Sequence, residues 1–482
     1  MESFLVPYVS LCGVTLIIGW FLHWVYKWVN PPCKGKLPPG SMGFPIIGET
    51  FQFLKTSRSI DIPSCYQQRL SRYGPVFKTN LLGKPLVVSM DPELDRFIFQ
   101  QEGKLFRLWL PEAGNNIFGK KTVTMHSDAT HRLIRSIASK LFGPENLKEV
   151  LIRELEDVMR MSMAAWAAKP SIDVKDSVAD MIFDLIAKKM INMDSNQSRE
   201  LRKNFDDFSK GIFSFPIYFP GTLFYKCMKG RRNIHRKLTE MLKDRLSTPG
   251  RKHGDLLDVL VEELRSEKPL IDESLATDLL AVFLLASMET TSSTLSIALK
   301  FLTDNPKVVE TLKEEHETIM EKREDNNSGF TWAEYKSLTF TTQVMNEVNR
   351  ISNIAPGIFR KALTDVQVNG YTIPAGWLVM ISPMAVHLNP TLFEDPLKFN
   401  PWRWMITDEA KRITQMRNFM PFGGGIRFCL GADFAKLVIS LFLHVLVTNY
   451  RWIPVKGGEI VRFGEIAMIP LGYHIQLVPT TK

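Results

Sequence analysis

A single cysteine, Cys429, follows a run of glycines near the C-terminal end of the chain. Residues 421–431 read Pro-Phe-Gly-Gly-Gly-Ile-Arg-Phe-Cys-Leu-Gly. Glycine has no Cβ, so this run can fold tightly and approach a flat group closely. If a helix starts directly after the cysteine, backbone N–H groups and the helix dipole stabilise a thiolate there. A thiolate on such a loop is a good ligand for iron, although a lone cysteine is more often a small buried residue.

A second chemical constellation lies in a long apolar segment. We expect one helix from about Glu273 to Asp304, with Glu-Thr-Thr-Ser-Ser at residues 289–293 in its middle. The apolar run between Asp278 and Glu289 is too short to cross a membrane, so the pattern predicts a buried core helix. Hydroxyl side chains can donate to a carbonyl one turn earlier and loosen the helix. This would open space for a small ligand, whereas a plain polar stripe is the alternative.

A third pair consists of Glu347 and Arg350, three residues apart on a helix predicted from about Thr339 to Ile351. This spacing places both side chains on one helix face. An ordinary surface ion pair, worth less than ~1 kcal/mol, would explain the spacing as well.

The spacing Phe422-x-x-Gly425-x-Arg427-x-Cys429-x-Gly431 resembles the haem-binding loop of cytochrome P450 monooxygenases at each defining position. The resemblance implies that Cys429 is the axial ligand of haem b iron and that the other four residues contact the cofactor. It extends from Leu-Pro-Pro-Gly at 37–40 to the C-terminal strands. Residues 40–49, 219–222 and 399–404 look like a plant branch whose members oxidise brassinosteroids, triterpenes, gibberellin precursors and taxanes.

Residues 286–290, Ala-Ser-Met-Glu-Thr, resemble the oxygen-activation segment of that family, Ala-Gly-x-acid-Thr. The resemblance implies that Thr290, with Glu289 behind it, holds water and relays protons to bound oxygen. Ser287 departs from the pattern, because the family usually has glycine there. The shape of the oxygen groove is therefore expected to differ.

The family resemblance also assigns roles to charged residues. Glu347 and Arg350, with Arg403 in the segment Phe-Asn-Pro-Trp-Arg-Trp at 399–404, resemble a buried Glu–Arg–Arg triad that holds the haem-side core together. Haem propionates need cations, and the matching positions are Arg427, Arg360, Arg135 and His131. His131 stands where the family often has tryptophan, but histidine can still donate to a carboxylate.

Composition excludes several classes of protein. The chain has 482 residues and a formal net charge of +9 at pH 7, but its Lys and Arg residues are spread along the sequence, so we expect no nucleic-acid partner. The densest basic stretch, residues 226–237, is either a solvated helix face or a contact for membrane or an acidic partner. The five cysteines form no CxxC pair and no closely spaced framework, which argues against a disulfide scaffold or structural zinc.

The N-terminal segment predicts a membrane anchor. Residues 3–26 carry no charged side chain and are long enough to cross a bilayer, tryptophans cluster at the C-terminal end of the run, and lysines follow it. Glu2, where a cleaved signal peptide would have basic residues, argues for an uncleaved anchor. We expect a single-pass anchor at 1–28 in the endoplasmic reticulum membrane, a Pro/Gly-rich hinge at 29–48, and a cytosolic catalytic domain at 49–482.

The elements that must position these residues are mainly helical. We expect a mainly α fold with a smaller β portion, the cytochrome P450 fold by resemblance, with a long central helix over the haem, the cysteine loop and small antiparallel sheets. Strand patterns lie at 75–100, 366–381 and 466–479, and helical periodicity dominates from about 105. Residues 213–221, aromatic and interrupted by proline, are either a buried loop or a membrane-dipping lid.

By resemblance, the protein hydroxylates an unactivated C–H bond of a nonpolar polycyclic terpenoid, a triterpenoid or steroid, with a diterpenoid as the alternative. It would use O2 and NADPH-derived electrons from NADPH–cytochrome P450 reductase, and contact membrane lipid. A reductase-independent isomerase or dehydratase, or a non-enzymatic haem protein, would not need Glu289 and Thr290. No charged residue stands among the substrate-pocket positions that the family implies: Phe106, Leu108, Trp109, Leu110, Phe118, Phe213, Phe283, Ala286, Ile354, Ala355, Ile358, Met468 and Ile469.

Overall fold

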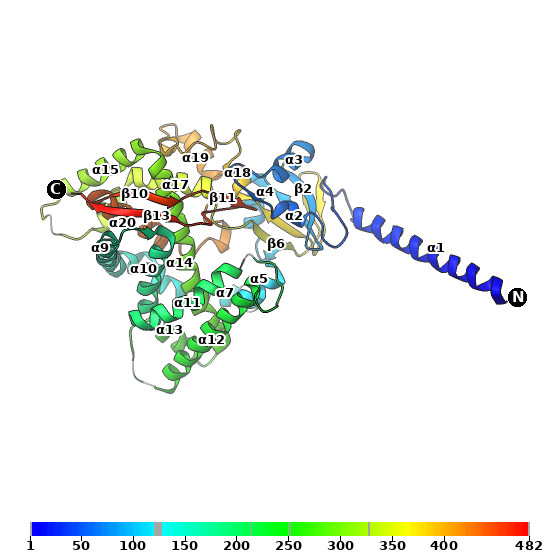
Figure 1. The fold of residues 1–482 in the computed structure, drawn as a ribbon, viewed down its shortest axis with the longest axis horizontal. Helices are drawn as coiled ribbons and strands as arrows, with labels where there is room; N and C mark the ends of the chain where they lie inside the picture. The colour runs from blue at the N-terminus through cyan, green and yellow to red at the C-terminus, as the bar shows by residue number, and fades with distance from the viewer. Residues whose placement is uncertain are drawn as a thin grey trace.

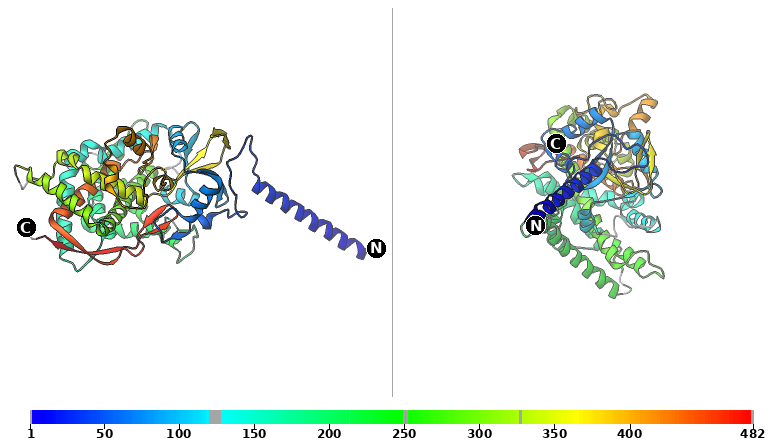
Figure 2. Two further views of the ribbon diagram at one scale, coloured as in Figure 1. Left: turned by 90° about the horizontal axis from the view of Figure 1, so that it is seen from above. Right: turned by 90° about the vertical axis from the view of Figure 1, so that its right-hand side faces the viewer.

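The structure is a computed structural model that describes residues 2–119, 128–212, 214–248, 250, 252–325 and 328–480. Helix α1 (Glu2–Val29) projects from one end of a single body, and the C-terminus lies at the opposite end (Figures 1 and 2). None of the apolar stretch Leu11–Val29 is buried in the protein, whereas 67% of the apolar window in α14 (Glu273–Asp304) is. The predicted core helix is therefore confirmed with the predicted bounds. Helix α1 contacts the body near its C-terminal end, where Trp28 Nε1 donates to Gly43 O at 3.2 Å.

The largest sheet lies at the end of the body from which α1 extends (Figure 1). Its strand order is β2-β3-β9-β6-β4, formed by Val76–Leu81, Lys84–Ser89, Leu378–Ile381, Ile358–Ala362 and Phe106–Leu108. Strands β3 and β9 pair in parallel, so the prediction of purely antiparallel sheets is wrong for this pair. Parallel pairing requires a long crossover, and here most of the helical body connects the two strands.

The strand prediction over residues 75–100 needs a second correction. After the β2–β3 hairpin, α4 (Pro92–Gln100) is a helix. Asp91 caps it by accepting the backbone N–H groups of Glu93 and Leu94, and Pro92 fits the first turn because it has no N–H to satisfy. Alternating apolar residues in a short segment could not separate these two structures.

Three small sheets complete the β portion. They have the strand orders β1-β11-β12, β10-β13-β5 and β7-β8. Their strands are β1 (Thr56–Ser57), β5 (Ile172–Asp173), β7 (Val366–Val368), β8 (Tyr371–Ile373), β10 (Tyr450–Gly457), β11 (Val461–Phe463), β12 (Ile466–Met468) and β13 (Tyr473–Pro479).

The helical part packs around α14 and α20 (Ala432–Asn449), which run through the body beside one another (Figure 1). Phe142 joins these two helices, because its ring packs against Phe283 at 6.2 Å and Phe434 at 5.2 Å between centroids. The surrounding helices include α3 (Ser64–Tyr73), α5 (Glu112–Phe118), α7 (Asp128–Phe142), α9 (Ile152–Ala167), α10 (Val174–Ile191), α11 (Ser195–Gly211), α12 (Leu223–Ser247), α13 (Leu256–Leu264), α15 (Pro306–Glu321), α17 (Thr339–Ser352), α18 (Pro383–His387) and α19 (Glu409–Arg417).

The Pro/Gly-rich segment after α1 lies along the edge of the large sheet. The backbone N–H of Lys78 donates to Pro39 O at 2.7 Å, and Glu49 N–H donates to Asn80 O at 2.8 Å. The Glu49 carboxylate also binds buried Arg69 at 2.7 Å. These contacts hold the segment against the body between α1 and the helices that follow.

Candidate active site

The glycines before Cys429 are required by the backbone and by packing. Gly423 and Gly425 have φ angles of +74° and +64°, a region that other residues rarely adopt. A Cβ on Gly424 would lie 2.7 Å from the ring of Phe99, and one on Gly425 would lie 2.4 Å from the Phe99 carbonyl oxygen. The loop is therefore pressed against the C-terminal end of α4.

Cys429 is held at the end of this loop by its own backbone and by Arg135 of α7. Its N–H donates to Phe422 O at 3.1 Å, and Arg135 Nη1 donates to Phe428 O at 3.0 Å and to Ile426 O at 3.3 Å. The side chain of Cys429 is open to solvent on one side, but the protein around it raises the pKa of the thiol. A hydrogen bond from Gly431 N–H and the charge of Arg135 lower that pKa and only partly offset the burial.

The expected stabilisation of a thiolate by a backbone N–H is therefore present, but burial has the larger effect on the pKa. A bound metal ion deprotonates a coordinating thiol directly, so an iron ligand does not need a low pKa beforehand.

The Glu347, Arg350 and Arg403 side chains come together as a buried cluster. Arg350 binds Glu347 with two hydrogen bonds of 2.9 Å, and Arg403 Nε donates to Glu347 Oε1 at 2.9 Å. Glu347 and Arg350 are completely buried. The surface-pair alternative is therefore excluded. Trp404 Nε1 also donates to Glu347, at 3.0 Å, so both carboxylate oxygens accept more than one hydrogen bond.

His387 links this cluster to the cysteine loop and was not identified from sequence. Arg350 Nη1 donates to its carbonyl oxygen at 2.8 Å, and its Nε2 accepts Met420 N–H at 2.9 Å. Met420 O in turn accepts Gly423 N–H at 3.1 Å. Burial, followed by the Arg350 charge, lowers the pKa of His387 to about 3, so the ring is neutral and can act as the acceptor. A histidine in an apolar segment carries no sequence signal for this role.

Two of the predicted propionate ligands converge on one carboxylate. Arg360 Nε lies 2.5 Å from Glu102 Oε2, and Arg427 Nε lies 3.4 Å from Glu102 Oε1. Arg135 of α7 donates to two carbonyl oxygens of the cysteine loop. Half-buried His131 lies one turn earlier on the same helix. Glu102 was not identified from sequence, because nothing in its surroundings along the chain distinguishes it from a surface acid.

The residues present fit a haem group with carboxylate side chains. Neither contact of Glu102 has hydrogen-bond geometry, and within the described chain the two guanidiniums form one hydrogen bond, from Arg360 Nη1 to Phe359 O. Several cationic N–H groups are thus free for an acidic ligand. A Cβ on Gly431 would meet no protein atom within 4 Å, which leaves room beside Cys429. Cys429 offers the soft sulfur ligand that haem iron accepts.

The oxygen-side segment lies on one exposed face of α14. Ala286 and Thr290, one turn apart, are exposed, whereas Ser287, Met288 and Thr291 are buried. Thr290 Oγ1 donates to Ala286 O at 2.8 Å, as predicted, but the helix continues without a break. The expected loosening of the helix is therefore wrong. The Ser287 hydroxyl donates to Leu284 O at 3.0 Å on the buried side, so it does not project into this surface.

Glu289 has a partner that the sequence did not indicate. Its Oε1 lies 2.5 Å from Nζ of Lys175, at the start of α10, and both side chains are about one-third exposed. The carboxylate is thus partly open to solvent and paired with a cation from a neighbouring helix.

The described pocket candidates divide into two groups, those that are buried and those that are open to solvent. Phe106 is completely buried in the core beside the large sheet, where it packs against Phe97, so its assignment to the pocket wall is wrong. Phe283 is buried as well and packs on Phe142. Phe213 lies outside the described residues. The other candidates are partly or fully open to solvent: Leu108, Trp109, Leu110, Phe118, Ala286, Ile354, Ala355, Ile358, Met468 and Ile469.

Two buried polar residues hold part of this wall together. Asn353 Nδ2 donates to Ala355 O at 3.0 Å and to Glu465 O at 3.1 Å. Completely buried Arg462 donates to Glu465 O at 2.7 Å and to Ile351 O at 2.9 Å. The loop after α17 and the β11–β12 turn are therefore joined, although more than one hundred residues separate them.

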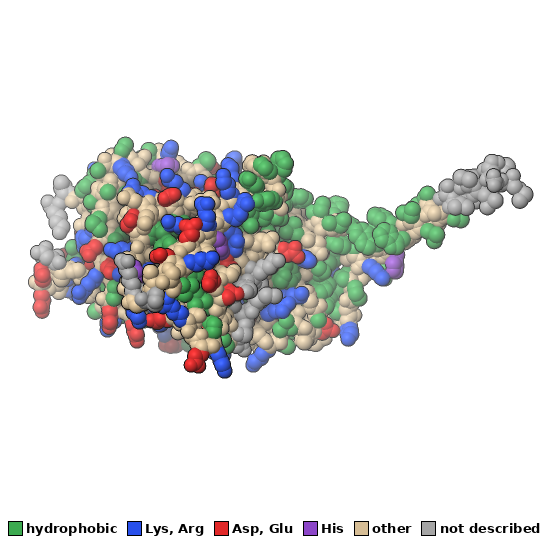
Figure 3. Space-filling model, turned by 90° about the horizontal axis from the view of Figure 1, so that it is seen from below, with side chains coloured by type: hydrophobic (Ala, Val, Ile, Leu, Met, Phe, Trp, Pro, Cys, Tyr) green, Lys and Arg blue, Asp and Glu red, His purple; other side chains and the backbone are tan. Residues whose placement is uncertain are grey.

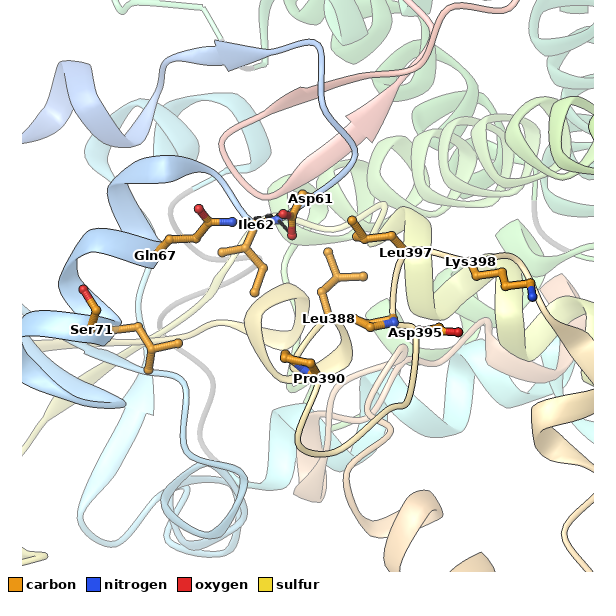
Figure 4. A pocket seen from close by; sticks show the side chains of 11 residues that line it. Asp61, Ile62, Gln67, Ser71, Leu388, Pro390, Asp395, Leu397 and Lys398 are labelled. Atoms are coloured by element: carbon orange, nitrogen blue, oxygen red, sulfur yellow. Dashed lines mark hydrogen bonds between the residues drawn. The ribbon is translucent and has the colours of Figure 1, made fainter.

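A surface groove of about 750 Å³ lies elsewhere, between α3 and the segment after α18 (Figure 4). Ile62, Leu388, Pro390 and Leu397 form its apolar floor. None of the predicted site residues lines it, so it is separate from the cysteine loop.

Comparisons with known proteins agree with this geometry. The family model for cytochrome P450 matches residues 38–477. The chain is 48% identical to cytochrome P450 87A3 from Oryza sativa subsp. japonica over 99% of its length and 93% of that protein. It is 41% identical to a beta-amyrin 16-alpha-hydroxylase from Maesa lanceolata, covering 94% of this chain and 95% of that one. It is 40% identical to a cucurbitadienol 11-hydroxylase from Siraitia grosvenorii, covering 96% and 98%.

A solved structure supports the fold. Cyanobacterial CYP120A1 with bound retinoic acid superposes with a TM-score of 0.80 at 26% identity, and covers 93% of this chain and 100% of its own. The family and fold imply haem-thiolate iron, O2 and NADPH-derived electrons supplied through a reductase. The chain therefore belongs to the cytochrome P450 family and is a cytochrome P450 monooxygenase.

Proposed function

We propose that this enzyme hydroxylates a triterpenoid or steroid. The observation that carries the proposal is the similarity, over nearly the whole chain, to hydroxylases named for beta-amyrin and cucurbitadienol. A relative named cholesterol 22-monohydroxylase, from Paris polyphylla, is 37% identical over 87% of the chain. The open wall residues are apolar, which suits a polycyclic hydrocarbon skeleton with few polar groups.

The chain's own residues have distinct parts in this reaction. When bound, haem-thiolate iron supplies the power to insert an oxygen atom into a C–H bond. Cys429 would hold the iron, and Arg360, Arg427, Arg135 and His131 would hold the propionates. Thr290 holds water on the exposed face of α14, and Glu289 passes protons to it from the Lys175 side. The apolar wall orients the substrate and excludes bulk water.

We also propose a membrane orientation. Exposed apolar residues lie next to α1 on the body, where hydrophobic side chains gather (Figure 3). They come from three segments, two of which meet through Phe51 and Phe215, 6.1 Å apart between ring centroids. The described part of the loop before α12 is exposed, which favours the lid alternative over a buried loop. The set comprises Phe44, Ile46, Ile47, Phe51, Leu82, Phe215, Ile217, Tyr218, Phe219 and Leu223. With α1 as a single-pass anchor, it would rest on the cytosolic face of the endoplasmic reticulum.

The substrate proposal is tested by co-expression with a plant NADPH–cytochrome P450 reductase in a host supplied with beta-amyrin, cucurbitadienol, cholesterol or a diterpene acid. We expect a product one oxygen atom heavier from a triterpenoid or steroid, seen by mass spectrometry and absent with Cys429→Ala. Turnover of the diterpene acid alone would overturn the substrate class. Product without the reductase would instead favour a rearrangement enzyme.

A further inference from the structure

Glu102 is a buried acid placed between two cations of the haem site. It follows α4, and its side chain is only 4% exposed. Besides Arg360 and Arg427, its Oε1 accepts Leu108 N–H at 3.0 Å, at the end of β4. The same carboxylate therefore joins α4, β4, β6 and the cysteine loop.

The surrounding packing leaves Glu102 little freedom. Phe99, one turn before it, fills the space against Gly424 and Gly425, and its ring lies 5.9 Å from the Arg360 guanidinium carbon. Arg360 is 2% exposed, so its charge needs a partner within the protein. Glu102 supplies that partner.

We propose that Glu102 is a positioning residue for the haem propionates. It fixes the Nε sides of Arg360 and Arg427, so that their remaining N–H groups point to a common ligand. It also sets the formal charge of the three residues at +1, which one propionate neutralises. The inference rests on the family's haem cofactor and is independent of the substrate.

An opposite role is conceivable from the same contacts. A carboxylate that merely fills the site in the absence of ligand would repel a propionate and would have to leave when haem binds. Replacement of Glu102 by glutamine would then tighten haem binding. Positioning predicts looser binding, so the direction of the change separates the two roles.

The test uses the full-length holoenzyme in detergent and two readouts other than turnover. For Glu102→Gln, we expect haem transfer to excess apomyoglobin to be about tenfold faster, because charge-assisted hydrogen bonds are left poorly oriented. The haem reduction potential should shift in the positive direction, because a nearby negative charge is lost. Glu102→Asp keeps the charge but shortens the side chain, so haem loss should rise while the potential stays closer to wild type.

Glu49→Gln is the matched control. Glu49 is also a buried acid paired with an arginine, Arg69, at 2.7 Å, and it lies in the segment after α1, outside the proposed haem site. The Glu49→Gln variant should have a lower unfolding midpoint but an unchanged haem reduction potential and an unchanged rate of haem loss. Slower haem loss in Glu102→Gln, an unchanged potential, or equal effects of both glutamine variants would overturn the proposal.

Discussion

The cysteine loop and the exposed face of α14 are built in different ways. The loop is held by residues distant in sequence: Phe99 against its glycines, Arg135 on two of its carbonyls, and His387 on Met420. On α14, the hydroxyls of Ser287 and Thr290 donate to carbonyls of their own helix, and Glu289 adds one ion pair in which both side chains are about one-third exposed. Ligand geometry is therefore protected by several tertiary contacts, whereas the oxygen side rests on bonds within α14 and on the ion pair between Glu289 and Lys175.

This difference predicts that substitutions in the buried cluster and at His387, which support the cysteine loop, lower the stability of the protein. Substitutions on the exposed face of α14 should instead change the reaction of an enzyme that still folds. The largest effect is expected for Arg350→Met. It leaves the Glu347 carboxylate buried with fewer partners, at a cost of about 3–5 kcal/mol in the free energy of unfolding. Little haem-loaded protein should be recovered. Lys252→Met removes an exposed pair with Glu262 and should leave the free energy of unfolding nearly unchanged. Similar losses in both variants, measured by urea unfolding, would contradict the first half of the comparison.

Thr290→Ala should fold normally and bind haem. Because its hydroxyl is proposed to hold water for proton delivery, the ratio of product formed to NADPH consumed should fall about tenfold or more. Thr294→Ala is the control, since Thr294 makes the same type of bond, to Thr290 O at 2.9 Å, but is buried. If coupling is retained in Thr290→Ala, or lost equally in both variants, the proton-relay role is wrong.

His387 should make the stability of the protein depend on pH. Its pKa of about 3 when folded is below the ordinary value of 6.5, so the unfolded state binds the proton first as the pH falls. The stability associated with neutral His387 is present above about pH 6.5 and is lost below it, by about 1.4 kcal/mol between pH 7.5 and 5.5. His387→Gln keeps an acceptor for Met420 N–H but cannot titrate. Its urea midpoint should therefore fall less over this range than that of wild type, and an equal fall would refute the assignment.

The smallest effect is expected for Lys175→Ala, which releases Glu289 from its ion pair. Stability should change by less than ~1 kcal/mol, because the pair is partly exposed. Coupling and its solvent isotope effect should change about two- to threefold, since Glu289 would carry protons less directly. Lys189→Ala is matched to it: the residue lies on the same helix and pairs with Glu154 at 2.5 Å. Identical behaviour of the two variants would show that the Glu289 pair has no part in proton delivery.

Sequence reasoning recovered the parts of the site that are written as short motifs. The bounds of α14 follow from its apolar pattern, whereas the triad and the assignment of Cys429 as the iron ligand rest on the resemblance of these motifs to the family. The partners Glu102, His387 and Lys175 could not be found, because each acts on a residue far away along the chain. Phe106 was placed on the pocket wall by family position, but its strand faces the core. The parallel β3–β9 pairing likewise depends on contacts between segments about 290 residues apart, which no local pattern encodes.

The role assigned to the cysteine loop depends on one bond, between the Cys429 sulfur and the haem iron. The absorption spectrum of the reduced, CO-bound, full-length protein reports this bond directly. We predict the red-shifted Soret band of a thiolate ligand in wild type and its loss in Cys429→Ala. A folded, haem-loaded wild-type protein whose Soret band lacks that shift would contradict the assignment of Cys429 as the iron ligand.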